Sequence, residues 1–264
     1  AFYIDPWQRV DRAVTTHAPG DHLRSGSRAY LCAESARALV AHRLGSDAAV
    51  SAVRYGEVVE LGGVRVSLHP AGHILGSAQV RVERRGEVWV ASGDYKRAAD
   101  PTCAPFEPIR CHAFITEATF ALPVFRWDPP GDTVRDICAW WDEMRGAGRP
   151  AVLFGYGLGK AQRLLAELAA LTDQSVYVHG MMLGMIEAYR EVGVALPDVK
   201  QVIESKRRSS GAPSSRAGGG GRRSFAGELI LAPLSARGTP WMRRLGTHSD
   251  AFASGLMRVR GVRR

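Results

Sequence analysis

The stretch Pro70–Arg97 reads PAGHILGSAQVRVERRGEVWVASGDYKR and decides the fold of this chain. Its middle alternates apolar and polar residues, which predicts strands at 78–84 and 86–91. His73 precedes this run and Asp94 follows it, and each stands where a strand ends and a loop begins. Metal ligands are often found at such places, so both residues are candidate ligands.

A second group of candidate ligands lies upstream, in the segment THAPGDH. His17, Asp21 and His22 belong to it and follow the apolar-periodic segment IDPWQRVDRAVTT. Imidazole and carboxylate both bind zinc at roughly 2.0–2.2 Å, and a carboxylate can bridge two ions about 3.5–4 Å apart. With His73 and Asp94 the group predicts most of a dinuclear site, and Asp94 is the natural bridge. Such ions lower the pKa of a shared water to around 7, which predicts hydrolysis of a phosphoryl, acyl or thioester centre.

The order of these motifs resembles that of a known family. The order HAPGDH, then GH, then SGD resembles the order HxHxDH, GH and SGD of the metallo-β-lactamase superfamily. The fuller pattern resembles its nucleic-acid-processing branch, the metallo-β-lactamase/β-CASP nucleases, and is most like the bacterial DNA ligase-associated exonucleases. The segments that carry the resemblance span nearly the whole chain: YIDPW, SRAYLC, PAGHILGSAQVRVE, GEVWVASGDYKR, DPTCAPFEPIRCHAFITEATF, FGYGLGKAQR, LAPLSARGTPWMRR and SDAFASG.

The resemblance implies an α/β fold, a metallo-β-lactamase αββα sandwich with an inserted β-CASP α/β domain. It implies a metal-dependent DNA exonuclease that hydrolyses phosphodiester bonds at DNA ends during repair, with RNA as the alternative substrate. The implied cofactor is zinc, two ions in the family, with manganese as the alternative. The implied partners are DNA and an ATP-dependent DNA ligase.

Carried over residue by residue, the resemblance puts His17 and His73 on the first metal. It puts Asp21 and His22 on the second metal, with Asp94 between the two ions. For these positions the family context outweighs the ordinary interpretation of a lone histidine as a surface or core residue. The remaining histidines are interpreted as structural: His42, His69, His112 and His248.

Three further residues match family motifs. Asp5, in YIDPW, would orient ligands from behind, although a turn cap before Pro6 explains it equally well. Glu117 in TEATF and His179 in YVHG match the first two β-CASP motifs, which lie beside the metals in the family. There the histidine serves phosphate binding or protonation of the leaving group; the plainer interpretation is a polar residue at a strand end. The candidate catalytic residues are Asp21, Asp94, Glu117 and His179.

The chain departs from the family at two ligand positions. Pro19 stands where the family has the second histidine of HxHxDH, and proline has no donor atom. A late histidine expected beyond ASG is missing, because the sequence ends at Arg264. These departures favour an alternative, a catalytically inactive relative that binds nucleic acid or a ligase partner. A small-molecule hydrolase is a third hypothesis, disfavoured by the helical insertion with Glu117 and His179.

Periodicity predicts a two-part organisation. Residues 1–120 read as the sheet-rich part, with a helix at 33–44 and further strands at about 50–53, 57–61 and 64–69. Residues 121–227 alternate helices with short apolar strands, which predicts parallel βαβ units, and include a Gly/Ser/Arg-rich flexible loop at about 205–224. The resemblance implies that residues 228–264 return to the first domain, apparently truncated.

Charge fits a polyanionic partner. The chain of 264 residues has 35 Lys and Arg against 26 Asp and Glu, a formal net charge of +9. Lysine and arginine gain affinity by releasing counterions from phosphates. Lys96, Arg97 and Lys160 are the candidate nucleic-acid contacts. FGYGLGKAQR is not a phosphate loop of the Walker A type, since Phe154 and Ala161 occupy required positions; a strand-to-helix turn is the plain interpretation.

The remaining signals concern location. No run of about eighteen apolar residues is present, and the start AFYIDPW has no signal-peptide pattern, so neither a membrane span nor export is expected. The four cysteines lack CxxC spacing, which indicates reduced thiols in a cytoplasmic protein.

Overall fold

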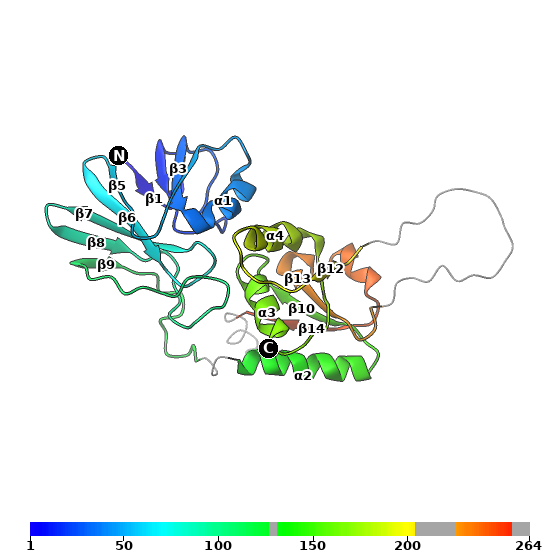
Figure 1. Cartoon of the computed structure of the whole chain (residues 1–264). Helices are drawn as coiled ribbons and strands as arrows, with labels where there is room; N and C mark the ends of the chain where they lie inside the picture. Colours follow the sequence, from blue (N-terminus) through cyan, green and yellow to red (C-terminus); the bar gives the residue numbers. More distant parts are fainter. Residues whose placement is uncertain (127–130, 204–224, 255–264) are drawn as a thin grey trace, which may run out of the picture.

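The computed structural model describes residues 1–126, 131–203 and 225–254 (Figure 1). These residues form an α/β fold with one four-stranded and two five-stranded sheets. The predicted α/β class is therefore confirmed, with both parallel and mixed sheets. We call the sheets A, B and C; sheets A and B make up the first half of the chain, and sheet C with its helices the second half.

Sheet A is parallel, in the order β1-β2-β3-β4. Its strands are β1 (Tyr3–Ile4), β2 (Arg12–Val14), β3 (Ala29–Ala33) and β4 (Val50–Val53). The 3-10 turn η1 (Glu34–Ala36) and helix α1 (Arg37–Leu44) connect β3 to β4, in agreement with the helix predicted at 33–44. Helix α1 ends at Gly45, whose φ of 86° suits glycine.

Sheet B is mixed, in the order β5-β6-β7-β8-β9. Neighbouring strands are antiparallel except β8 and β9, which are parallel. Its strands are β5 (Val58–Leu61), β6 (Val64–Pro70), β7 (Ala78–Arg84), β8 (Glu87–Ala91) and β9 (Ala113–Ile115). Tight two-residue turns at Gly62–Gly63 and Arg85–Gly86, with positive φ at every position, close two of its hairpins.

One hydrophobic core joins sheets A and B. Val14 of β2, Leu39 of α1 and Leu68 of β6 all belong to it and are almost fully buried. Alternation explains the inward face of sheet B, because Val66 and Leu68 of β6 are both 0% exposed. The same core includes Tyr189 from the second half, so the two halves share apolar packing.

Sheet C is parallel throughout, in the order β12-β11-β13-β10-β14. Its strands are β10 (Ala151–Gly155), β11 (Val176–Val178), β12 (Val199–Gln201), β13 (Leu229–Pro233) and β14 (Ser249–Phe252). Between them lie α3 (Lys160–Ala169) and α4 (Leu183–Glu191), and α2 (Asp132–Gly146) precedes β10. Figure 1 shows α4 on the side of sheet C nearest to α1 of the first half. The predicted alternation of helices with parallel strands is present.

The late strands differ from expectation. Instead of returning to the first half, β13 lies between β11 and β10 in sheet C, and β14 pairs with the other side of β10. The physical reason is the apolar run LILA, which is buried at all four positions and therefore suits a central parallel strand covered on both faces. The predicted loop at about 205–224 lies outside the described residues.

Candidate metal centre

The ends of strands from two sheets carry the candidate ligands. In parallel sheet A, Asp5 follows β1 and His17 follows β2. In sheet B, β6 and β8 run in the same direction because each is antiparallel to β7, so His73 and Asp94 leave the sheet at the same edge. Binding sites in open α/β sheets form at such carboxyl ends.

Four side chains, the ligand cluster, converge on one another: His17, His22, His73 and Asp94. The Nε2 atoms of His17 and His73 lie 3.7 and 3.8 Å from Oδ2 of Asp94. Nε2 of His22 lies 3.4 Å from Oδ1 of the same carboxylate. Atoms that each lie about 2.0–2.2 Å from one ion are separated by roughly 3–4 Å, so this spacing fits divalent metal ligands.

Hydrogen bonds on the far side of two imidazoles aim the Nε2 atoms inward. Asp5 Oδ2 lies 2.8 Å from Nδ1 of His22 and 2.5 Å from the Thr16 hydroxyl, which donates to it. The Thr16 oxygen is 2.9 Å from Nδ1 of His17. Because the Thr16 proton is committed to Asp5, we infer that His17 donates through Nδ1. Nε2 of His17 then keeps its lone pair for a metal.

His17 supplies the observation that tests whether the cluster fits a metal. Its side chain is 1% exposed, and its Nε2 atom is buried without a hydrogen-bond partner. A buried polar atom with no partner is costly unless something binds it. A divalent ion would satisfy that atom, and His17, His73 and Asp94 together offer it three donor atoms within 4.8 Å of one another.

Asp5, His17 and His22 form a second group with metal-ligand spacing. The Asp5 carboxylate already accepts from His22, from the Thr16 hydroxyl and, through Oδ1, from the Thr16 amide at 2.8 Å. These bonds use three of the about four acceptor positions of a carboxylate. Asp5 therefore suits the orientation of ligands better than direct coordination, and it does more than cap a turn.

The charge states of His73 and Asp94 suit metal binding, whereas His22 carries a proton. Burial and the nearby His17 lower the pKa of His73 to about 4, so its imidazole is neutral at pH 7. The imidazoles of His17 and His22 hold the pKa of the Asp94 carboxyl far below its usual range. Burial alone would lower the pKa of His22, but the carboxylates of Asp5 and Asp94 raise it to about 10. An ion would displace that proton on binding.

Gly93 allows the two sheets to approach each other at the cluster. Its φ is +55°, and a Cβ added there would lie 2.7 Å from Cβ of Thr16. The glycine of SGD thus leaves room for Thr16, next to His17, beside the backbone that carries Asp94. Thr16 was not singled out from the sequence; the only signal was a hydroxyl residue directly before a candidate ligand.

Pro19 and Asp21 lie in the turn between His17 and His22, and both bear on the number of metal ligands. Asp21 is 72% exposed in its side chain, with Oδ2 3.9 Å from Nε2 of His22. The carbonyl of Pro19 accepts from the amides of His22 and Leu23 at 3.0 and 2.8 Å, which closes the turn. Pro19 thus shapes the loop but contributes no side-chain ligand.

The two β-CASP candidates have different surroundings. Glu117 follows β9 at the same sheet edge as Asp94, and its negative charge acts to raise the pKa of His73. His179 follows β11 in sheet C, where Nδ1 accepts from the Met181 amide at 3.1 Å and the ring packs against Trp241 with centroids 4.6 Å apart. The described contacts thus bring Glu117 near the ligand cluster, and those of His179 lie within the second half.

Basic side chains meet between the halves. The buried Asp100 carboxylate binds the Lys96 ammonium and lies 3.9 Å from Nε of Arg163. Burial and the charges of Arg163 and Lys96 lower the pKa of Lys160, which places these cations close together. Arg97 is exposed. Asp100 thus lies against one cation of each half, Lys96 and Arg163.

The four histidines interpreted as structural have partners of their own. His69 Nδ1 lies 3.1 Å from Glu107, His112 accepts from the Val88 amide at 3.0 Å, and His248 Nδ1 lies 2.7 Å from the Gly246 carbonyl. His42 packs against Gly184 of α4.

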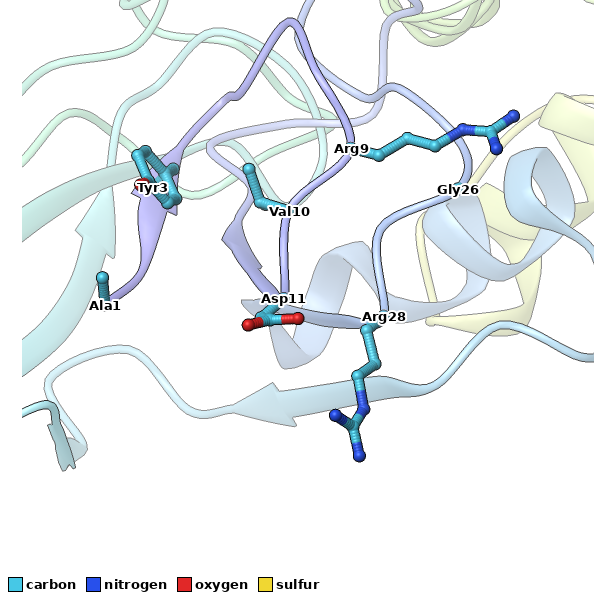
Figure 2. Close-up of a pocket in the computed structure, with 7 residues that line it drawn as sticks. All are labelled: Ala1, Tyr3, Arg9, Val10, Asp11, Gly26 and Arg28. Carbon is cyan, nitrogen blue, oxygen red and sulfur yellow. The ribbon is translucent and has the colours of Figure 1, made fainter.

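A separate pocket of about 520 Å³ lies at the opposite edge of sheet A. It is lined by residues at the amino ends of β1, β2 and β3: Ala1, Tyr3, Arg9, Val10, Asp11, Gly26 and Arg28. Figure 2 shows the guanidinium groups of Arg9 and Arg28 pointing away from each other. The ligand cluster lies at the carboxyl ends of the same strands, so this pocket is not part of it.

The sequence of this chain is distantly similar to those of several known proteins. The chain is 28% identical over 261 residues to a probable DNA ligase of Opitutus terrae, covering 96% of this chain and 23% of that protein. It is 26% identical over 221 residues to Ribonuclease TTHA0252 of Thermus thermophilus, covering 74% and 49%. It is 27% identical over 118 residues to cleavage and polyadenylation specificity factor subunit 3 of Dictyostelium discoideum, covering 44% and 15%. The chain thus spans less than half the length of these relatives.

Among solved structures, a protein of unknown function from Enterococcus faecalis V583 has a similar fold, with a TM-score of 0.51 and 11% identity over 91% of this chain and 57% of that one. No protein-family model matches the chain. The predicted resemblance is thus confirmed as a distant similarity to nucleases and to a probable DNA ligase. Within the described residues, no helix has the length and apolar character to cross a membrane.

Proposed function

We propose that this chain is a metal-dependent DNA exonuclease, which hydrolyses phosphodiester bonds at DNA ends in concert with an ATP-dependent DNA ligase. The observation that carries the proposal is the convergence of three Nε2 atoms on the Asp94 carboxylate. The similarity to a ribonuclease supports a nucleic-acid substrate, and the similarity to a probable DNA ligase supports DNA and the ligase partner. RNA is the alternative substrate.

The arrangement of the three sheets supports a proposed fold. Sheets A and B, with their common core, are the two sheets of a metallo-β-lactamase αββα sandwich. The parallel sheet C and its helices are the β-CASP insertion. Four free cysteines support a reducing compartment and a cytoplasmic location.

The proposed ions are zinc, with manganese as the alternative. His17, His73 and Asp94 would hold the first ion, and Asp21, His22 and Asp94 would hold the second. When bound, such ions supply a Lewis acid and a water of lowered pKa that can attack a phosphodiester. The hard oxygen of Asp94 and imidazole nitrogens are donors that zinc accepts readily.

The chain's own residues have separate proposed tasks. Asp5 and Thr16 hold the imidazoles in the tautomer that leaves Nε2 free, supported by the contacts at 2.8 and 2.9 Å. Glu117 and His179 serve proton transfer and phosphate binding at the scissile bond. Lys96, Arg97 and Lys160 bind the nucleic-acid backbone, and the contact of Asp100 with both Lys96 and Arg163 supports basic side chains from both halves at this place.

The test measures metal content by plasma mass spectrometry and digestion of end-labelled linear DNA on the same sample. We expect at least one zinc or manganese ion per chain and digestion that a covalently closed circle resists. Asp94→Asn should abolish both metal retention and digestion, whereas Asp47→Asn, an exposed carboxylate beyond α1, should change neither. The proposal is contradicted if the wild-type protein purifies without metal and does not digest DNA.

One observation favours a second candidate function. Pro19 supplies no side-chain donor in the turn between His17 and His22. A relative that binds DNA or a ligase without cleavage fits this loss. The same sample separates the two functions, because this candidate requires DNA binding in a gel-shift assay without any digestion.

A further inference from the structure

The loop that carries His73 is contacted from the second half of the chain. The hydroxyl of Tyr189, on helix α4, accepts a hydrogen bond from the Leu75 amide at 3.2 Å. Tyr189 is 0% exposed, and 114 positions separate the two residues. A buried tyrosine hydroxyl needs a hydrogen-bond partner, and a buried amide needs one equally.

Other bonds hold this loop from within the first half. The Ser77 hydroxyl accepts from the amides of His73 and Ile74 at 3.1 and 3.2 Å. Tyr55 donates to the Ser77 carbonyl at 3.0 Å. The Leu75 amide is directed away from this network, toward α4. The loop is thus held by the first half at Ser77 and by the second half at Leu75.

A second contact from the second half lies next to the first. Gly159, just before α3, packs so closely on Ile74 that an added Cβ would lie 2.3 Å from its Cγ2 atom. Ile74 and Leu75, the two residues directly after His73, are only 5% and 6% exposed. Elements of the second half therefore contact both residues directly after a candidate ligand, the Ile74 side chain and the Leu75 amide.

We propose that Tyr189 is a positioning residue of the metal centre, which holds the His73 loop in its ligating position from the second half. The inference rests on the proposed function, since it concerns the same metal site. The second half would thus contribute to the metal centre as well as to substrate contact. Displacement of α4 would move His73 relative to His17 and Asp94 and weaken ion binding. Metal affinity and the docking of the two halves are then coupled.

The experiment compares Tyr189→Phe with Tyr177→Phe in the full chain. Each variant removes one hydroxyl from a tyrosine that is no more than 6% exposed, but Tyr177 lies in β11 of sheet C. Hydrogen exchange of the metal-free protein reports the protection of the Leu75 amide. Titration with Co²⁺ alone, followed by its visible absorption bands, reports affinity and ligand geometry at the centre.

We expect Tyr189→Phe to increase exchange at Leu75, to weaken Co²⁺ binding about three- to tenfold and to alter the absorption bands. Tyr177→Phe should leave all three unchanged. Wild-type Co²⁺ affinity and spectrum in Tyr189→Phe would overturn the inference while the proposed function stands. A wild-type chain that binds no Co²⁺ would overturn both. Equal losses in the two variants would show a general packing effect and also overturn the inference.

Discussion

The Asp5 carboxylate lies 2.8 Å from Nδ1 of His22, and it reaches that atom from a backbone with a φ of 43°. A positive φ is uncommon outside glycine, and aspartate and asparagine tolerate it best. The strained backbone holds Asp5 where it can also accept from Thr16. One carboxylate thus orients two imidazoles, one directly and one through a hydroxyl.

Asp5→Asn should lower metal affinity about 10- to 100-fold, as loss of a carboxylate behind a histidine ligand typically does. Asparagine tolerates the backbone conformation, so the fold should persist. Titration with Zn²⁺ in competition with a chromophoric chelator measures the change. The matched control is Asp11→Asn, an exposed residue near the amino end of β2. Equal affinity in Asp5→Asn and wild type would exclude an orienting role.

Thr16→Val should destabilise the fold by about 1–3 kcal/mol, because it leaves the buried Nδ1 of His17 without a partner and removes one of the two hydrogen bonds to Oδ2 of Asp5. Thr16→Ser keeps the hydroxyl and should recover most of the loss. Urea denaturation of the metal-free variants measures both. If the Thr16→Val and Thr16→Ser variants prove equally stable, the hydrogen-bonded link from Asp5 through Thr16 to His17 is refuted.

Pro19→His should raise metal affinity and any nuclease activity, because it restores a donor in the turn between two candidate ligands. The carbonyl at this position, which accepts from His22 and Leu23, is unchanged by the substitution. Metal stoichiometry by mass spectrometry and the digestion rate of linear DNA measure the gain. A gain in neither quantity shows that residue 19 is not a ligand position.

Acid should weaken the contact between the halves at Asp100. Burial alone would raise the pKa of Asp100, but hydrogen bonds from Lys96 and Thr102 hold it below its usual value. A carboxyl with a depressed folded pKa stabilises the protein above its unfolded pKa of about 3.9, and that stability is lost as the pH falls through the folded pKa. The affected window therefore lies below about pH 4.

Denaturation midpoints between pH 7 and pH 3 measure this loss. Asp100→Asn should be less stable than wild type at pH 7, because it leaves Lys96 without its buried partner. Its stability should also fall less steeply below pH 4. Parallel curves for the two proteins would assign the acid sensitivity to other groups.

Local patterns predicted much of the fold. Alternation predicted strands at 78–84 and 86–91, and β7 and β8 lie at 78–84 and 87–91, because half-buried strands leave a period-2 signal. The ligand cluster followed from motif order, and its members do converge. The Asp5–Thr16 contact carries no local signal, because parallel pairing of β1 with β2 brings the two residues together across the chain. The place of β13 was missed because a buried apolar strand does not reveal which sheet it joins.

The origin of the ligands has a mechanical consequence. His17 follows a strand of sheet A, while His73 and Asp94 follow strands of sheet B. An ion bound by all three would act as a staple between the sheets, in the way that a disulfide joins two segments of a secreted protein. A chelator would then lower the stability of the fold as well as abolish activity. The concentration of available metal would also determine how long the folded chain resists proteolysis.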